Sequence, residues 1–435
     1  MEKIRSLFAK PIDRKIEEVI KVDQANEQTV LSELEEYIVT DSIKDHFERV
    51  YDEIIAVSKS PREGIGVWVS GFFGSGKSSF AKILGYTVAA IPVSGKPASE
   101  IFKENVKDAK VSGLIDVINR TLPTHAVIFD VSMDRGIRTA SERITEIMYK
   151  ALLRELDYAE DFDLAELEIT LEGDGKLDDF CQRFEKMHNK PWRVRRKVGT
   201  GLNEASAVLH AMDARTYSSA DSYAKSLGEK GRADISPNTL AERAFELASR
   251  RKPDKALIFI IDEVGQYVSR SVDKMLDLQA VVQAFGKEGK NRVEGKKATS
   301  PFWIVVTSQE KLNEIVDALD SKKIELARLQ DRFRITIDLK QTDIPEITGK
   351  RVLDKKEGSK AKLKTLYDAN DGRLKTLCAL ERTSRDVSVS KENFVNLYPY
   401  LPYQIDLSID IVAGLRLKRG AHRHIGGSNR TIIKC

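Results

Sequence analysis

A glycine-rich stretch between two apolar segments constrains the fold of this 435-residue chain more than any other feature. The preceding run, residues 64–71 (GIGVWVSG), is short and largely apolar, which predicts a buried strand. After the glycines, residues 77–90 (KSSFAKILGYTVAA) place apolar side chains at helical spacing. Strand, glycine loop and helix in this order form the first unit of a parallel α/β sheet.

Further apolar runs alternate with amphipathic segments along the chain. They predict strands within 125–133, 255–264, 302–310 and 334–339, and helices within 42–59, 138–156, 238–251, 274–287 and 311–333. The 42–59 helix is expected to have Asp41 or Ser42 as its N-cap. Strands of this kind between amphipathic helices favour a three-layer α/β/α core with a mainly parallel sheet.

Composition changes along the chain predict its domain organisation. We expect an N-terminal helical extension (1–63), a core in two halves (64–156 and 236–345), a partly helical insertion (157–235), and a mostly helical C-terminal region (346–435). The last residues read as the opening of another helix after Ser428, so we expect a longer natural chain.

Overall charge and cysteine content exclude several classes of protein. The 71 basic and 67 acidic residues leave a net charge of +4, too small to indicate nucleic-acid binding by itself. Cys181, Cys378 and Cys435 are widely spaced, which excludes a disulfide framework or a zinc site and fits a reducing cytoplasm. The first residues lack the apolar core of a signal peptide, and no apolar run is long enough to span a membrane.

Residues 71–78 (GFFGSGKS) fit the phosphate-loop pattern G-x-x-x-x-G-K-[ST] in full. In such a loop the backbone N–H groups and the following helix N-terminus surround a phosphate, the lysine reaches β- and γ-phosphate oxygens, and the hydroxyl binds Mg²⁺. The predicted ATP-binding residues here are Gly71, Phe72, Phe73, Gly74, Ser75, Gly76, Lys77, Ser78 and Ser79, with Lys77 also catalytic and Ser78 a metal ligand. The alternative is a plain glycine turn into a helix.

An acidic pair ends the strongest apolar run, LIFIIDEV. Asp262 at the carboxyl end of a strand is predicted to hold Mg²⁺, and Glu263 to act as the general base that activates water. This pair is typical of ATPases with an extra strand between the two motif-bearing strands, and residues 125–131 (HAVIFDV) are our candidate for that strand. The alternative is a buried strand that ends in a solvated acidic pair.

Two further positions are candidates for contacts to the γ-phosphate. Thr307, Ser308 and Gln309, at the end of WIVVTSQE, are all candidates for a sensor of the γ-phosphate or the attacking water. Arg332, before the strand RITIDL, is predicted to be an arginine finger that reaches a neighbouring subunit. Arg328 and Arg334 compete for this role, and a helix C-terminal arginine that complements the dipole is the alternative.

Two basic segments are candidates for DNA contact. Residues 190–197 (KPWRVRRK) place Trp192 between cations, which suits a phosphate backbone and a stacked base. Residues 416–434 carry six Lys or Arg and no acid. The alternative for both is a solvated charged face, and Arg430 could also approach the nucleotide from a lid.

The chain resembles the BREX phage-defence P-loop ATPases of the BrxC/PglY family. The resemblance rests on FAKPIDRKIEEVIKVDQ and LSELEEYIVTDSIKDHFERVYDEI near the start, on the phosphate loop, and on LIFIIDEVGQY, DRF and LYPYLPYQIDL further along. It implies a cytoplasmic AAA+-like ATPase in which residues 71–78 bind ATP, Asp262 binds Mg²⁺ and Glu263 is catalytic. It also implies other BREX proteins as partners, action in phage restriction and host DNA methylation, and longer relatives.

Three functions are compatible with these motifs. The first is an ATP-driven switch that hydrolyses ATP as a nucleotide-dependent oligomer. The second is a slowly hydrolysing, ATP-gated scaffold that recruits partners to DNA. The third, a small-molecule kinase, is disfavoured because the pair Asp262 and Glu263 indicates water as acceptor. We also expect one of Phe72 and Phe73 to pack under the loop and the other to face a lid, a base or a neighbouring subunit.

Overall fold

The fold is built around one five-stranded sheet, seen in a computed structural model that describes residues 3–12, 22, 26–72, 74–131, 143–230, 234–269, 271–318, 329–377 and 388–417. The strand order is β4-β5-β6-β1-β7, and every pairing is parallel. The strands are β1 (Gly66–Gly71), β4 (Thr124–Asp130), β5 (Ala256–Asp262), β6 (Trp303–Ser308) and β7 (Ile335–Leu339). The predicted α/β class with a parallel sheet is therefore confirmed.

The strand between β1 and β5 is β6, so the prediction for residues 125–131 is wrong. Among the described strands, β4 pairs only with β5 and is the edge strand of the sheet. Burial explains the difference, because β6 is buried at all six positions whereas His125, Ile128 and Asp130 of β4 are only half-buried. Apolar character predicts that a segment forms a strand. Which strands lie beside it in the sheet depends on contacts between segments that are distant in the sequence.

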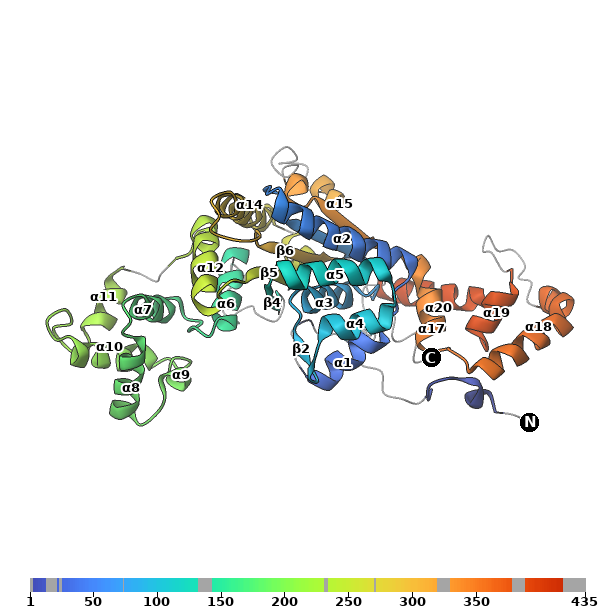
Figure 1. Ribbon diagram of the computed structural model, residues 1–435, viewed down its shortest axis with the longest axis horizontal. Helices are drawn as coiled ribbons and strands as arrows, with labels where there is room; N and C mark the ends of the chain where they lie inside the picture. Colours follow the sequence, from blue (N-terminus) through green and yellow to red (C-terminus); the bar gives the residue numbers. More distant parts are fainter. Residues whose placement is uncertain are drawn as a thin grey trace.

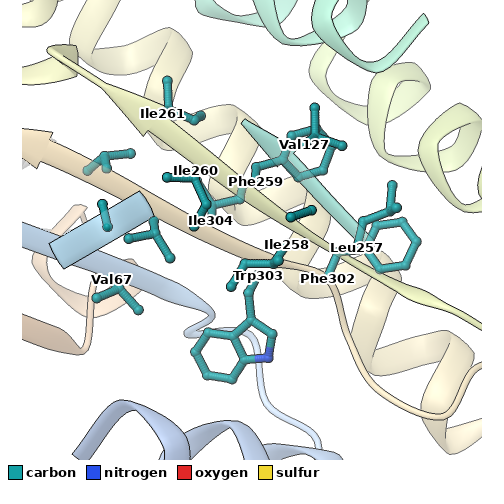
Figure 2. Close-up of a cluster of buried hydrophobic side chains, with 14 of the residues drawn as sticks. Val67, Val127, Leu257, Ile258, Phe259, Ile260, Ile261, Phe302, Trp303 and Ile304 are labelled. Carbon is teal, nitrogen blue, oxygen red and sulfur yellow. The ribbon is translucent and has the colours of Figure 1, made fainter. Parts of the chain in front are cut away.

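Helices cover both faces of the sheet. On one face, Gly85 of α3 (Lys77–Val88) packs so closely on Ile260 of β5 that an added Cβ would lie 2.8 Å from the Ile260 Cγ1. On the other, the rings of Phe259 and Phe285 meet edge to face, with centroids 5.4 Å apart. Figure 2 shows the apolar side chains of β5 and β6 that fill this core. Alternate residues of one strand thus serve opposite layers, which gives a three-layer arrangement.

The helices around the sheet fall into two groups. With α3 (Lys77–Val88) lie α1 (Glu27–Glu36), α2 (Asp41–Lys59), α4 (Ala98–Val106), α5 (Ala109–Thr121) and the small hairpin of β2 (Pro92–Val93) and β3 (Lys96–Pro97). With α14 (Val272–Glu294) lie α6 (Ile144–Glu155) and α12 (Pro237–Arg251). Two short helices, α13 (Val264–Val268) and α15 (Leu312–Ala318), follow β5 and β6.

The α2 helix, placed in an N-terminal extension by the sequence, belongs to the main core. Its Phe47 lies against Phe80 of α3, with ring centroids 4.3 Å apart. Its N-cap is neither Asp41 nor Ser42, because the hydroxyl of Thr40 accepts the hydrogen bond from the Ile43 N–H. Capping therefore begins one residue earlier than the sequence suggested.

The predicted insertion forms a helical unit at one end of the molecule (Figure 1). It contains α7 (Phe162–Gly173), α8 (Leu177–His188), α9 (Trp192–Arg195), α10 (Gly201–Met212) and α11 (Ser222–Lys230). Trp192 is only 3% exposed and belongs to the unit's own hydrophobic cluster. Its Nε1–H donates to Glu168 Oε1 at 2.6 Å, and Arg196 pairs with the same carboxylate. The suggestion that Trp192 stacks on a base is therefore wrong.

The C-terminal region lies at the other end of the molecule (Figure 1). It contains η3 (Gln341–Asp343), α17 (Ile344–Arg351), α18 (Glu357–Leu377), α19 (Lys391–Leu397) and α20 (Pro402–Leu417). The N-terminal turn η1 (Ile4–Leu7) precedes a residue that bridges to Lys355 in this region. Within the described ranges, none of the helices combines the length and apolar character that a membrane crossing requires. Arg430 and most of the basic segment 416–434 lie outside the described residues.

Candidate functional site

The predicted phosphate loop connects β1 to α3 at the carboxyl edge of the sheet. Gly76 caps α3 in the left-handed region, with φ of 92°. Gly71 has φ of 152°, and an added Cβ would lie 2.6 Å from Ser75 Oγ and 2.9 Å from the Leu339 carbonyl oxygen. Only glycine fits these two positions without strain, so the backbone here requires the residues that the motif supplies.

Lys77 begins α3 and points back across the loop. Its Nζ donates to the Phe72 carbonyl oxygen at 3.0 Å, and the residue is only 6% exposed. Burial lowers the pKa of the Lys77 ammonium, although Glu263 and Asp262 partly offset the effect. The two carboxylates offset the positive charge of Lys77. The site therefore attracts an anion only when further positive charge balances the carboxylates.

Asp262 and Thr307 join two neighbouring strands at the same edge. The Thr307 hydroxyl donates to Asp262 Oδ1 and accepts from the Glu263 N–H at 3.0 Å. Asp262 is 4% exposed, and its carboxylate also bonds to the Ser78 side chain. Burial raises the pKa of Asp262, whereas the bonds from Thr307 and Ser78 oppose that rise. The structure thus brings together Ser78, Asp262 and one of the three predicted sensor residues.

Glu263 occupies a backbone conformation that is rare for its residue type. Its φ of 60° and ψ of 22° lie in the left-handed region, at the N-cap of α13. Burial, and after it the charge of Asp262, raise the pKa of Glu263 to about 7. Among the described residues its buried Oε2 has no hydrogen-bond partner. A strained backbone and an unsatisfied carboxylate oxygen are typical of a residue held for function.

The acidic side chains fit a magnesium ion that is shared with a phosphate. Asp130, at the end of β4, lies directly opposite Asp262 in the sheet register. The described part of the chain contains no cluster of three or more His, Cys, Asp or Glu that could hold a metal alone. Mg²⁺ in nucleotide sites usually takes only one or two protein ligands and completes its shell with phosphates and water. Ser78 and Asp262 supply such a pair.

No bond from the other two sensor candidates to Asp262 or Glu263 is seen among the described residues, and Arg332 lies away from the loop. Ser308 Oγ accepts from the Glu310 N–H at 3.1 Å, and Gln309 is half-buried after the strand. Arg332 pairs with Glu63 at 2.7 Å, and its carbonyl lies beside Gly66 at the start of β1. Arg332 lies near the start of β1, and Lys77 follows the end of β1. Because β1 spans about 17 Å, the two residues are at opposite ends of the strand. It cannot reach the loop of its own chain.

A cavity of about 100 Å³ beside the loop was not foreseen from the sequence. Its wall contains Gly74, Ser75, Gly76 and Ser79 of the loop region, together with Glu33, Tyr37, Ile38, Ile43 and Ile83, and with Ile344, Ile347, Thr348 and Arg351 of α17. These segments are separated by some 300 residues, and no local pattern marks them as neighbours. Apolar side chains with a few polar groups are typical of a site for the organic part of a ligand.

Of the two phenylalanines in the loop, the structure describes Phe72. Phe72 packs against a cluster formed by Phe8 and by Ile344, Leu353, Leu397 and Ile405 of the C-terminal region. The Phe72 ring therefore contacts the N-terminal segment and the C-terminal region. Phe73 lies outside the described residues.

No protein-family model matches the chain. No solved structure matches it either.

Proposed function

We propose that this protein binds and hydrolyses ATP as a P-loop ATPase of the AAA+-like class. One observation carries the proposal: Lys77, Ser78, Asp262, Thr307 and Glu263 meet at the carboxyl edge of β1, β5 and β6. The order of the five strands, with β6 between the strands that bear the two motifs, agrees with it. A sheet edge of this kind is where open α/β folds bind ligands.

In the proposed complex the loop holds the phosphates and the neighbouring cavity holds the base. Backbone N–H groups of the loop and the N-terminus of α3 would surround the β-phosphate. Lys77 would exchange its bond to the Phe72 carbonyl for the β- and γ-phosphate oxygens. Ser78 and Asp262 would hold Mg²⁺, which when bound neutralises charge on those oxygens. The ion would also supply the positive charge that the buried carboxylates lack.

Hydrolysis needs a base and a positioned water. We propose that the oxygen of a water molecule attacks the γ-phosphorus while Glu263 accepts a proton from that water. The bond between the γ-phosphorus and the bridging oxygen breaks, and this oxygen leaves with ADP. The bonds from Thr307 to Asp262 and to the Glu263 N–H hold the metal ligand and the base in a fixed relation. The unsatisfied Oε2 of Glu263 is the acceptor in this step.

The experiment is a comparison of ATP affinity and turnover in two site variants and two control variants. Lys77→Ala should lose ATP binding, while Glu263→Gln should keep it and stall hydrolysis. The exposed residues Lys96→Ala and Glu104→Gln are matched controls that should change neither quantity. Hydrolysis by Glu263→Gln at the rate of the unmodified protein would disprove the assignment of the base.

The resemblance to the BrxC/PglY family is the reason to propose a role in BREX defence. In this proposal the ATPase works in the cytoplasm with other BREX proteins, as a nucleotide-dependent homo-oligomer, to restrict phage and support methylation of host DNA. DNA contact through the basic segments is part of the proposal. The residues Arg193 and Arg196, however, are already paired with acidic side chains of the insertion.

A slowly hydrolysing, ATP-gated scaffold is the second candidate. It is favoured by one observation: Arg332, the predicted arginine finger, is paired with Glu63 of its own chain and not extended toward a neighbouring subunit. Turnover measured with and without DNA, together with sizing in ATP and in ADP, separates the two functions. Fast turnover that rises with oligomerisation favours the ATPase, and slow turnover in every state favours the scaffold.

A further inference from the structure

The N-terminal segment, residues 3–12, is attached to the C-terminal region by backbone hydrogen bonds. The Ala9 N–H donates to the Asp354 carbonyl oxygen at 2.8 Å, and the Lys356 N–H donates to the Leu7 carbonyl oxygen at 3.0 Å. Figure 1 shows this segment beneath the helices of the C-terminal region. The first residues of most chains are loosely held unless such contacts tie them down.

Phe8, between these two bonds, connects the segment to the phosphate loop. Its ring is 6% exposed and lies in the cluster against which Phe72 packs. The Lys355 ammonium lies 5.6 Å from the ring centroid and donates to the Asn396 carbonyl oxygen at 2.6 Å. An aromatic ring that contacts both a cation and an apolar cluster has little freedom to move.

Phe72 in turn holds the parts of the loop that would face phosphate. Its carbonyl oxygen accepts from Lys77 Nζ at 3.0 Å and from the Ser75 N–H at 3.2 Å. The position of Phe72 therefore determines the position of the Lys77 ammonium and the conformation of the loop backbone before a ligand binds.

A second contact from the segment reaches the cavity beside the loop. Lys10 pairs with Glu36 of α1 at 3.1 Å, and Glu36 lies 3.7 Å from Arg351 of α17. Arg351 lines the cavity together with Gly74 and Ser75. Residues 3–12 thus connect to the phosphate loop through Phe8 and to the cavity wall through Lys10, although none of them lines the cavity.

We infer that residues 3–12 form an N-terminal clasp in which Phe8 is a positioning residue for the phosphate loop, acting through Phe72. The inference rests on the proposed function, since it assumes that the loop binds ATP. The clasp keeps Phe72 against the C-terminal region, so that Lys77 and the loop N–H groups are arranged before the phosphate arrives. Preorganisation of this kind lowers the cost of ordering the site on binding.

The test is the Kd for ATP with Mg²⁺, measured by calorimetry. All proteins carry Glu263→Gln to prevent turnover, and the protein with this change alone is the parent. Phe8→Ala should weaken binding by about tenfold or more, because the loop must then be ordered by the ligand. Phe8→Leu, which restores apolar contact, should recover affinity to within about threefold of the parent. Ile12→Ala, at an exposed apolar residue of the same segment, is the matched control and should leave Kd unchanged.

Hydrogen exchange supplies a readout that a purely structural role would not move. In the parent protein, ATP should slow exchange in peptides that cover residues 3–12, although none of these residues lines the cavity. If Phe8→Ala does not fold, Phe8→Leu and this exchange experiment decide the matter. Unchanged exchange on adding ATP would overturn the clasp.

The outcomes also separate the clasp from the proposed function. If the parent binds ATP, Lys77→Ala does not, and folded Phe8→Ala binds as tightly as the parent, the clasp is wrong and the function stands. If the parent binds no ATP at all, the proposed function fails and the clasp falls with it.

Discussion

Lys82 of α3 and Glu33 of α1 form an ion pair at 2.8 Å in which the side chains are only 2% and 9% exposed. The pair joins the helix that follows the phosphate loop to a helix that lines the neighbouring cavity. Two buried charges are stable together because each compensates the other, and either one alone would carry an unpaid desolvation cost.

Glu33→Gln should therefore destabilise the protein strongly. We expect a loss of about 3–5 kcal/mol in the free energy of unfolding, since Lys82 stays buried without its carboxylate. Urea unfolding measures this loss. The double variant Lys82→Met with Glu33→Leu should be close to neutral. Lys96→Ala, which breaks the exposed pair with Glu104, should cost less than about 1 kcal/mol, and equal losses at both sites would contradict the prediction.

Thr307→Val should separate catalysis from binding. The valine keeps the shape but loses both bonds, so the Glu263 N–H loses its acceptor and the buried Asp262 carboxylate keeps its bond to Ser78 without the one from Thr307. The free energy of unfolding should fall by about 1–3 kcal/mol. Turnover should fall more than ATP affinity, because the base and the metal ligand lose their common anchor. Thr307→Ser should restore both quantities, and a fully active Thr307→Val variant would exclude this role.

Arg332→Ala should leave stability almost unchanged. The pair with Glu63 is partly exposed, so its loss should cost about 0–1 kcal/mol. If Arg332 acts in a neighbouring subunit, turnover should fall by about 10³-fold or more and lose its dependence on protein concentration, with ATP affinity retained. Lys96→Ala is the control, and Arg334→Ala tests the competing candidate. Undiminished turnover in Arg332→Ala would show that the arginine serves only its own chain.

Lys355 should make stability depend on pH. Burial lowers its pKa from the ordinary 10.5 to about 8. Between these values the unfolded chain binds more protons than the folded protein, so the free energy of unfolding rises with pH by up to about 1.4 kcal/mol per unit. Below pH 8 both states are protonated and this dependence disappears.

Urea unfolding of the wild-type protein and of Lys355→Met at several pH values between 7 and 10 measures this effect. The difference between the two free energies should grow with pH above 8, because methionine carries no proton to release. Lys96→Met, at an exposed position, should follow the wild-type curve. Parallel curves for wild type and Lys355→Met would refute the prediction.

The sequence predicted local features well because their causes are local. Short apolar runs predicted the five strands of the main sheet, and the loop pattern named residues whose backbone does require glycine. What it missed depends on distant partners. Trp192 lies between cations in the sequence yet is buried by the insertion's own core, and β4 resembles β6 in apolar character yet lies at an edge. The cavity wall joins α1 to α17, which no spacing rule connects.

The helical insertion has a consequence for how such a chain can change over time. The chain leaves the sheet after α6 and returns at α12, and these two helices contact each other. Among the described helices of the insertion, only α7 contributes side chains to both the main core around the sheet and the insertion's own cluster, so α8, α9 and α10 pack on a core of their own. Residues beyond α7 can therefore be lengthened, shortened or exchanged while the strands that carry Lys77 and Asp262 keep their neighbours, which makes this unit the natural place for diversification.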